Sequence, residues 1–421
     1  MASLLRNRTF VVLFSAQAIS LVGSGVTTIA LALFVHRLAG ASAATAVLGN
    51  ALMLRIAAFL LFSQPAGVLA DRVNRKVVLI ASDLARLALL ALFPFITTVW
   101  QVYAAVFAVN SLTAFFTPTF DASLPDVVGS EQYVKALSYS RIAVDLEAIA
   151  GPIIAGVLVA MIGLRWVFWF DGATYLVSAL LVSSVAIPSP RNARVPLVPT
   201  TLLGDITYGA RVLLRQAAIR QALLMSLAEA LAGACAIVIT VAYVRDILHG
   251  TETAYSLAMA AIGIGSGACA LVLGRYGSRL ERSATGEAAQ HGLRHRWASK
   301  SILLGGILLA LSLAPAALTP PLPFLAVLWV LNGAGQALIA IPSSTLVASH
   351  TLADERGRAF AAQFAITHAC WLFTYPLAGH LAESVGPSNA FLLCGLACLG
   401  ITGIAAAIGK PDAAHVHPGM G

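Results

Sequence analysis

Long apolar stretches alternate with short polar segments along the whole chain. A membrane-spanning helix needs about 20 apolar residues, because about 30 Å of hydrocarbon is crossed at about 1.5 Å per residue. Twelve stretches meet this requirement, and they lie near 9–35, 45–70, 77–96, 99–120, 138–163, 166–187, 218–244, 253–274, 300–318, 322–348, 359–385 and 387–408. The pattern therefore predicts an all-α membrane protein with twelve transmembrane helices.

A polar, proline-containing segment, SPRNARVPLVPTTLLGD, follows the sixth stretch and divides the spans into two sets of six. We expect an N-terminal six-helix bundle over 1–187 and a cytoplasmic linker over 188–217. A C-terminal six-helix bundle with a short cytoplasmic tail is expected over 218–421.

Two pairs of prolines indicate that the halves are repeats. Pro118 and Pro342 are 224 residues apart, and so are Pro152 and Pro376. The second proline of each pair lies in a small-residue step, GPIIAG in the first half and YPLAG in the second. The spacing fits two parallel six-helix repeats. The residues expected to bend and thin the helices for packing are Gly151, Pro152, Gly156 and Pro376.

The composition places these helices in lipid. Hydrophobic residues make up 59% of the chain and charged residues only 10%, with a mean hydropathy of +0.87. Soluble domains contain about 45–50% apolar residues.

The basic residues predict the orientation. Of the 26 lysines and arginines, 20 fall on the side that holds both predicted termini. Only Arg37, Arg165 and Arg245 fall on the other side. Basic residues collect in cytoplasmic loops, so both termini are expected in the cytoplasm. The net charge of +8 is then a topology signal, and no nucleic-acid partner is implied.

The loop between the second and third spans concentrates charge in the sequence GVLADRVNRKVVL. This sequence resembles the GxLaDRxGRRxxL signature of the major facilitator superfamily, with Asn74 in place of a glycine. We expect Asn74 to tolerate the left-handed backbone of a tight turn. The resemblance implies that the loop latches the two halves together at the cytoplasmic face in the outward-open state. The latch residues would be Gly67, Asp71, Arg72, Arg75 and Lys76.

Further segments resemble the exporters of that superfamily. GPIIAG resembles their antiporter signature, and ASDLARLALL is similar to the third span of multidrug, macrolide and siderophore permeases. The segments FTPTFDASLPDV, LSYSRIAVDLEAIAGP and FAAQFAITHACWLFTYPLAG resemble bacterial nickel- and cobalt-resistance exporters. The tail adds His415 and His417. The resemblance implies a proton-coupled exporter that works by alternating access in the bacterial cytoplasmic (inner) membrane.

Polar and ionisable residues within the spans are costly and mark candidate sites. Arg141 and Asp145 share a helical face, so they can form an ion pair. Glu147 needs another partner, either Arg55 or a proton that leaves it neutral. Two further residues, Gln17 and Glu229, lie near the middle of the membrane in the first and seventh spans. These residues, together with His368, form the candidate pathway for substrate or proton.

Two cargo classes remain open. By the repeat, His368 aligns beside Asp145, so Asp145, Glu147 and His368 are a candidate metal set, with donors suited to a borderline ion such as Ni²⁺. The alternative is an organic compound of the multidrug, macrolide or siderophore type. No GxxxxGK[ST] loop occurs, so an ATP-driven pump or enzyme is not indicated. We expect no cofactor, a proton as counter-ion, the bilayer as partner and a monomer.

Overall fold

A computed structural model describes residues 4–70, 72–188, 202–283, 287–351 and 355–409. Helices and connecting turns make up the described residues, and none of these residues is in a β-strand. In chain order the elements are η1 (Leu4–Arg6), α1 (Arg8–Ala70), α2 (Arg75–Leu92), η2 (Phe93–Phe95), α3 (Val99–Val128), α4 (Ser130–Ile162), η3 (Leu164–Trp166), α5 (Val167–Ser183), α6 (Leu202–Leu214), α7 (Ala217–Ala242), η4 (Tyr243–Ile247), α8 (Glu252–Ser283), α9 (Glu287–Leu313), η5 (Ala314–Leu318), α10 (Leu322–His350), α11 (Arg356–Val385) and α12 (Pro387–Ile408).

The first two predicted spans form the single long element α1. Only Gly40 interrupts it, with φ 76° and ψ 166°. Glycine adopts this backbone without a steric penalty because it has no Cβ. The two predicted spans are therefore joined at Gly40 alone, and the residues between 35 and 45 are otherwise helical.

Several helices extend beyond the apolar stretches that predicted them. α3 continues to Val128, α4 begins at Ser130, and α8 reaches Ser283. Hydropathy detects only the apolar part of such helices. Within the described chain, nine helical stretches are long and apolar enough to cross a membrane, and the first of them, Arg8–Ser63, contains the first predicted span and most of the second. Among the residues of α4 whose side chains are described, Leu146–Ile162 forms a shorter apolar helix.

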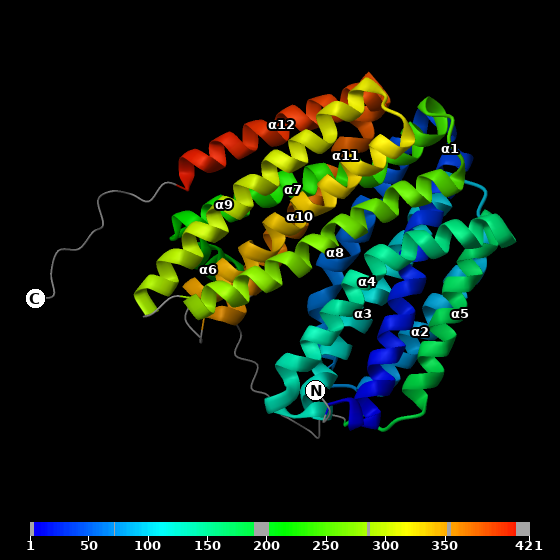
Figure 1. The fold of residues 1–421 in the computed structure, drawn as a ribbon. Helices are drawn as coiled ribbons and strands as arrows, with labels where there is room; N and C mark the ends of the chain where they lie inside the picture. The colour runs from blue at the N-terminus through cyan, green and yellow to red at the C-terminus, as the bar shows by residue number, and fades with distance from the viewer. Residues whose placement is uncertain (1–3, 71, 189–201, 284–286, 352–354, 410–421) are drawn as a thin grey trace, which may run out of the picture.

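The helices form two groups. α1 packs against α3, α4 and α5, whereas α7 to α12 pack against one another. The main contacts between the groups are α1 with α11 and α4 with α8. Figure 1 shows the groups meeting near the turn between α11 and α12 and diverging toward the two chain ends. We call the side with the start of α1 and the end of α12 the terminal face, and the side with Gly40 the hairpin face.

Small residues allow the two groups to approach closely toward the hairpin face. A Cβ on Gly156 of α4 would lie 2.9 Å from the Cβ of Ser256 in α8. On the other flank, Thr45 of α1 donates a hydrogen bond of 3.1 Å to the carbonyl of Gly379 in α11. A Cβ on Gly49 would lie 2.5 Å from the carbonyl oxygen of Tyr375. The GPIIAG and YPLAG steps are thus the places where the groups meet, with Pro152 and Pro376 inside the helices.

The segment predicted as a linker contains the helix α6, which packs on α11. Tyr208 of α6 donates a hydrogen bond to Glu355, and the guanidinium of Arg358 lies 4.2 Å from the centre of the Tyr208 ring. A cation over an aromatic face is attractive. These contacts attach the described part of the linker to the second group of helices.

Candidate functional site

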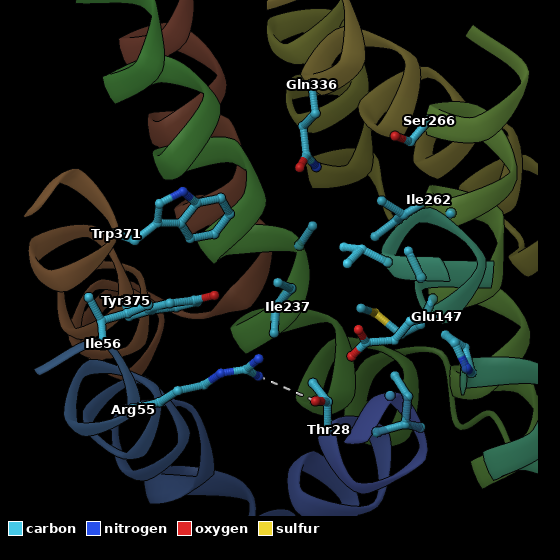
Figure 2. Close-up of a pocket in the computed structure, with 18 of the residues that line it drawn as sticks. Thr28, Arg55, Ile56, Glu147, Ile237, Ile262, Ser266, Gln336, Trp371 and Tyr375 are labelled. Carbon is cyan, nitrogen blue, oxygen red and sulfur yellow. Dashed lines mark hydrogen bonds between the residues drawn. The ribbon is translucent and has the colours of Figure 1, made fainter. Parts of the chain in front are cut away.

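A cavity of about 430 Å³ lies between the two groups of helices. Both groups line it: α1 and α4 from the first, and α7, α8, α10 and α11 from the second. Figure 2 shows the side chains of Arg55, Glu147, Trp371 and Tyr375 around this space. A site shared by two groups of helices changes shape whenever the groups move relative to each other.

Two opposite charges face this cavity from the first group. Arg55 of α1 and Glu147 of α4 point toward one another across it in Figure 2. The Arg55 guanidinium donates to the hydroxyl of Thr28 at 3.4 Å and attracts the Glu147 carboxylate electrostatically. Arg55, one of the two alternatives left open for Glu147, thus faces it across the cavity. Buried opposite charges reduce each other's desolvation cost.

The second group contributes an aromatic wall from α11. His368, Trp371 and Tyr375 are three to four residues apart, so they share one helical face. The rings of Trp371 and Tyr375 lie 5.1 Å apart. The imidazole of His368 stacks on Phe364 at 3.7 Å, and its Nδ1 lies 2.9 Å from the Phe364 carbonyl oxygen. Such a wall suits flat or apolar organic groups.

A glycine in α7 makes room for this wall. A Cβ at Gly233 would collide with the ring of Trp371. The absence of a side chain therefore lets the indole pack directly on the α7 backbone, which fixes its position at the cavity.

A second cavity of about 270 Å³ lies within the first group of helices. It shares Thr28, Arg55 and Glu147 with the first cavity. Gln17 lines the second cavity, and so does Asp171 of α5, which is only 1% exposed. Thr27 donates a hydrogen bond of 2.6 Å to Asp171. Two carboxylates and one guanidinium therefore line a mostly apolar cavity that borders the central one.

Glycines of α1 bring these carboxylates close to the helix. A Cβ at Gly23 would collide with Asp171, and a Cβ at Gly25 would lie 2.9 Å from Cγ of Glu147. Gly151 of α4 packs directly on Gly25, since its Cβ would lie 2.8 Å from the Gly25 Cα. The Gly-Ser-Gly segment of α1 and the first glycine of GPIIAG thus place α4 and α5 against α1.

A buried ion pair supports the interior of the first group. Arg86 of α2 pairs with Asp83, which also accepts a 2.7 Å hydrogen bond from Ser178. The Arg86 guanidinium lies 4.1 Å from the centre of the Tyr175 ring, and the Tyr175 hydroxyl lies 2.9 Å from the hydroxyl of Ser24. All of these partners belong to α1, α2 and α5, so the pair joins helices of one group.

The predicted pathway residues fall in different places. Arg55, Glu147 and His368 line the central cavity together, and Gln17 lines only the second cavity. Glu229 lines neither of the two cavities. The side chains of Arg141 and Asp145 lie outside the described part of the structure. Among the side chains that are described, no group of three His, Cys, Asp or Glu residues could hold a metal ion.

Sequence reasoning missed Asp171. It lies five residues into the predicted sixth span, so the rule that flags ionisable residues within spans would have identified it.

The charged loop anchors α2 to neighbouring helices of the first group. Arg75 pairs with Asp126 and donates to the carbonyl of Ala122 at 2.8 Å. Lys76 donates to the carbonyl of Ser183 at 2.7 Å. Arg72 is exposed, and Asp71 lies outside the described residues.

The expectation for Asn74 was wrong. Its backbone is extended rather than left-handed, with φ −60° and ψ 110°. Its side chain caps α2 by accepting a 3.0 Å hydrogen bond from the Lys76 amide. Asparagine is a favoured residue at this capping position, which explains its place in the loop.

The two helix groups and the cavity they share define a multi-pass membrane transporter. The chain belongs to the Major Facilitator Superfamily, whose sequence profile matches residues 13–286 and 222–418. The prediction from the signature in the charged loop is confirmed at the level of the superfamily.

Three relatives show how the chain compares within this family. It is 27% identical to the uncharacterised MFS-type transporter YfiS of Bacillus subtilis over 82% of the chain and 80% of YfiS. It is 25% identical to the multidrug efflux pump Tap of Mycolicibacterium fortuitum over 94% of each chain. The match to macrolide efflux protein A of Streptococcus pyogenes, at 28% identity, covers 48% of the chain and 51% of that protein.

Solved structures share the fold. A bacterial homologue of the human lysosomal transporter Spinster, in an inward-facing and unoccupied conformation, superposes with a TM-score of 0.68. The alignment covers 96% of each chain at 15% identity. The predicted twelve-helix major facilitator fold is therefore confirmed.

Proposed function

We propose that the protein is a secondary active exporter of amphipathic organic compounds that works by alternating access. The observation that carries this proposal is the central cavity, in which an aromatic wall from α11 faces Arg55 and Glu147 from the first group. Apolar and aromatic walls with a few fixed polar groups are typical of sites for organic ligands. Two relatives also support export of organic compounds, because one is a macrolide efflux protein and the other a multidrug efflux pump.

The terminal face is proposed to lie in the cytoplasm, because it holds most of the basic residues. The two helix groups meet toward the hairpin face and diverge toward the chain ends. The conformation is then inward-facing, which is the state in which an exporter loads its cargo.

The proposal includes a proton as the counter-ion. Glu147 and Asp171 are the carboxylates placed to carry it, because both line the cavity inside the first group. A carboxylate that exchanges its proton for a cationic substrate couples the two movements through one charge.

Closure of the terminal face is proposed to involve the charged loop. Gly67 has open space where a Cβ would be, so this conformation does not require a glycine there. We infer that a helix of the second group approaches Gly67 in the outward-facing state and that Asp71, Arg72, Arg75 and Lys76 then latch the halves.

Nickel or cobalt export receives less support. The relatives named above with a stated cargo export organic compounds. Glu147 and His368 do line one cavity, but the described side chains provide no third metal donor beside them.

Growth of a drug-sensitive bacterial host tests the cargo class. We expect expression of the protein to raise the inhibitory concentration of macrolides or of cationic dyes several-fold while leaving nickel and cobalt tolerance unchanged. A matched strain that expresses the Glu147→Gln variant serves as the control. Tolerance to nickel or cobalt, without any change for the organic compounds, would reverse the assignment.

A further inference from the structure

A hydrogen-bonded histidine–aspartate pair and an arginine–glutamate ion pair join the helix groups at the hairpin face. The Nε2 of His36, near the middle of α1, lies 3.0 and 2.8 Å from the two carboxylate oxygens of Asp246 in η4. The next residue, Arg37, donates from Nε and from Nη2 to one oxygen of Glu252, the first residue of α8, at 2.9 and 2.5 Å. We call these four residues the clasp. Its partners are more than 200 residues apart in sequence, so the clasp connects the two groups directly.

The turn between α7 and α8 presents both acids to α1. η4 is a single π-helical turn, and Asp246 lies within it. The side chain of Arg245 donates to the carbonyl of Gly250 at 2.6 Å, which closes the turn that leads to Glu252. Both carboxylates are therefore held by the same short segment of the second group.

The two pairs differ in burial. The side chain of His36 is 14% exposed and that of Asp246 is 32% exposed, whereas Arg37 is 58% exposed. Salt and water screen an exposed pair more than a partly buried one. The His36–Asp246 pair is screened less than the Arg37–Glu252 pair. A change in the charge of His36 is therefore expected to alter the attraction between the two helix groups more than an equal change at Arg37 would.

Several other charged groups lie near the clasp at the hairpin face, but none of them belongs to the His36–Asp246 pair. They are Arg165 of η3, Arg245 of η4, the exposed His249 in the turn between η4 and α8, and His380 and Glu383 of α11. Arg165 borders a hollow with Arg37, and His380 lies 3.3 Å from Glu383 on its own helix. Arginines keep their charge throughout the physiological pH range. Histidine is the residue type whose charge responds to pH near neutrality, and His36 is the one histidine among the four clasp residues.

We propose that the His36–Asp246 pair makes the clasp proton-sensitive, so that the clasp holds the hairpin face closed when His36 is protonated. The inference rests on the proposed function, in which this face looks outward and opens to release cargo. A charged imidazole forms a charge-assisted hydrogen bond to the carboxylate, which is stronger than the bond made by the neutral ring. External acid therefore favours the inward-facing state, and external neutral pH makes opening easier.

Distances between spin labels on the two groups measure the opening. Cysteines at Ala41 and Asn389, both exposed near the hairpin face, would carry the labels in a background without the five native cysteines. The parent, His36→Gln and His36→Arg would be compared at pH 5.5 and 7.5 in lipid nanodiscs. Glutamine keeps a hydrogen-bond donor without charge, and arginine keeps the charge at both pH values.

In the parent, we expect the ratio of short to long distances to be about threefold higher at pH 5.5 than at pH 7.5, a size typical of partly exposed pairs. His36→Gln should give the same low ratio at both pH values, and His36→Arg the same high ratio. A pH shift in His36→Gln as large as in the parent would overturn the clasp. If neither the parent nor either variant shows a long-distance population at either pH, the proposal of alternating access is contradicted, and the proposal of the clasp with it.

Discussion

The Glu147→Gln variant is expected to export its substrate at least about tenfold more slowly than the parent, a loss of about 1.4 kcal/mol. Glutamine has nearly the same shape but carries neither a negative charge nor an exchangeable acidic proton. Arg55 would then face the cavity without its opposite charge, and the cavity would lose the carboxylate proposed to meet a cationic substrate or a proton. Initial rates of dye efflux from energised cells would measure the effect.

The Glu383→Gln variant is the matched control for this experiment. Glu383 also lies in a long helix, but its side chain is 42% exposed near the hairpin face and far along α11 from the cavity wall. Its loss should leave the efflux rate within about twofold, because exposed ion pairs contribute little. Parental efflux by Glu147→Gln, at equal amounts of protein in the membrane, would remove Glu147 from the transport pathway.

The Gly151→Val variant is expected to lose both stability and transport. A Cβ at Gly151 would lie 2.8 Å from the Gly25 backbone, so α1 and α4 would have to separate. Overpacking of this kind costs about 1–3 kcal/mol, and each kcal/mol lowers Tm by about 2–4 °C in chains of about 150–250 residues. We therefore expect the Tm of the detergent-purified protein to fall by about 2 °C or more. Separation of the two helices would also displace Glu147, which packs on Gly25.

The Gly67→Ala variant tests whether Gly67 is needed for packing in the inward-facing structure or only in the outward-facing state. A Cβ at Gly67 meets nothing within 4 Å, so the Tm should remain within about 1 °C of the parent. Transport should nevertheless slow if a helix approaches Gly67 in the outward-facing state.

An unchanged Tm for Gly151→Val would show that the close contact between α1 and α4 is not required for the native packing.

The helical architecture was predictable because the bilayer constrains the length of every spanning helix. The exact ends of the helices were not. The predicted fifth span begins at 138, whereas α4 begins at Ser130, because a helix can continue into water with polar residues that hydropathy ignores. The extension at the start of α9 was missed for the same reason.

Individual site residues were predictable, but their grouping was not. Arg55, Glu147 and His368 attract notice because polar and charged groups are costly in lipid. Which of them share a cavity depends on the rotation and tilt of six helices, and these are set by contacts such as Gly25 with Gly151 that no local pattern reveals. The clasp was missed because His36 and Asp246 are each ordinary residues at the end of a span.

The most direct test of the proposed function is gradient-driven movement of an organic probe in proteoliposomes that contain only this protein. Vesicles with an acidic lumen would be mixed with ethidium or erythromycin, and accumulation in the lumen would be followed over time. We expect accumulation that requires the pH gradient and that is lost in the Glu147→Gln variant. Absence of gradient-dependent uptake of both probes, together with gradient-dependent uptake of Ni²⁺, would contradict it.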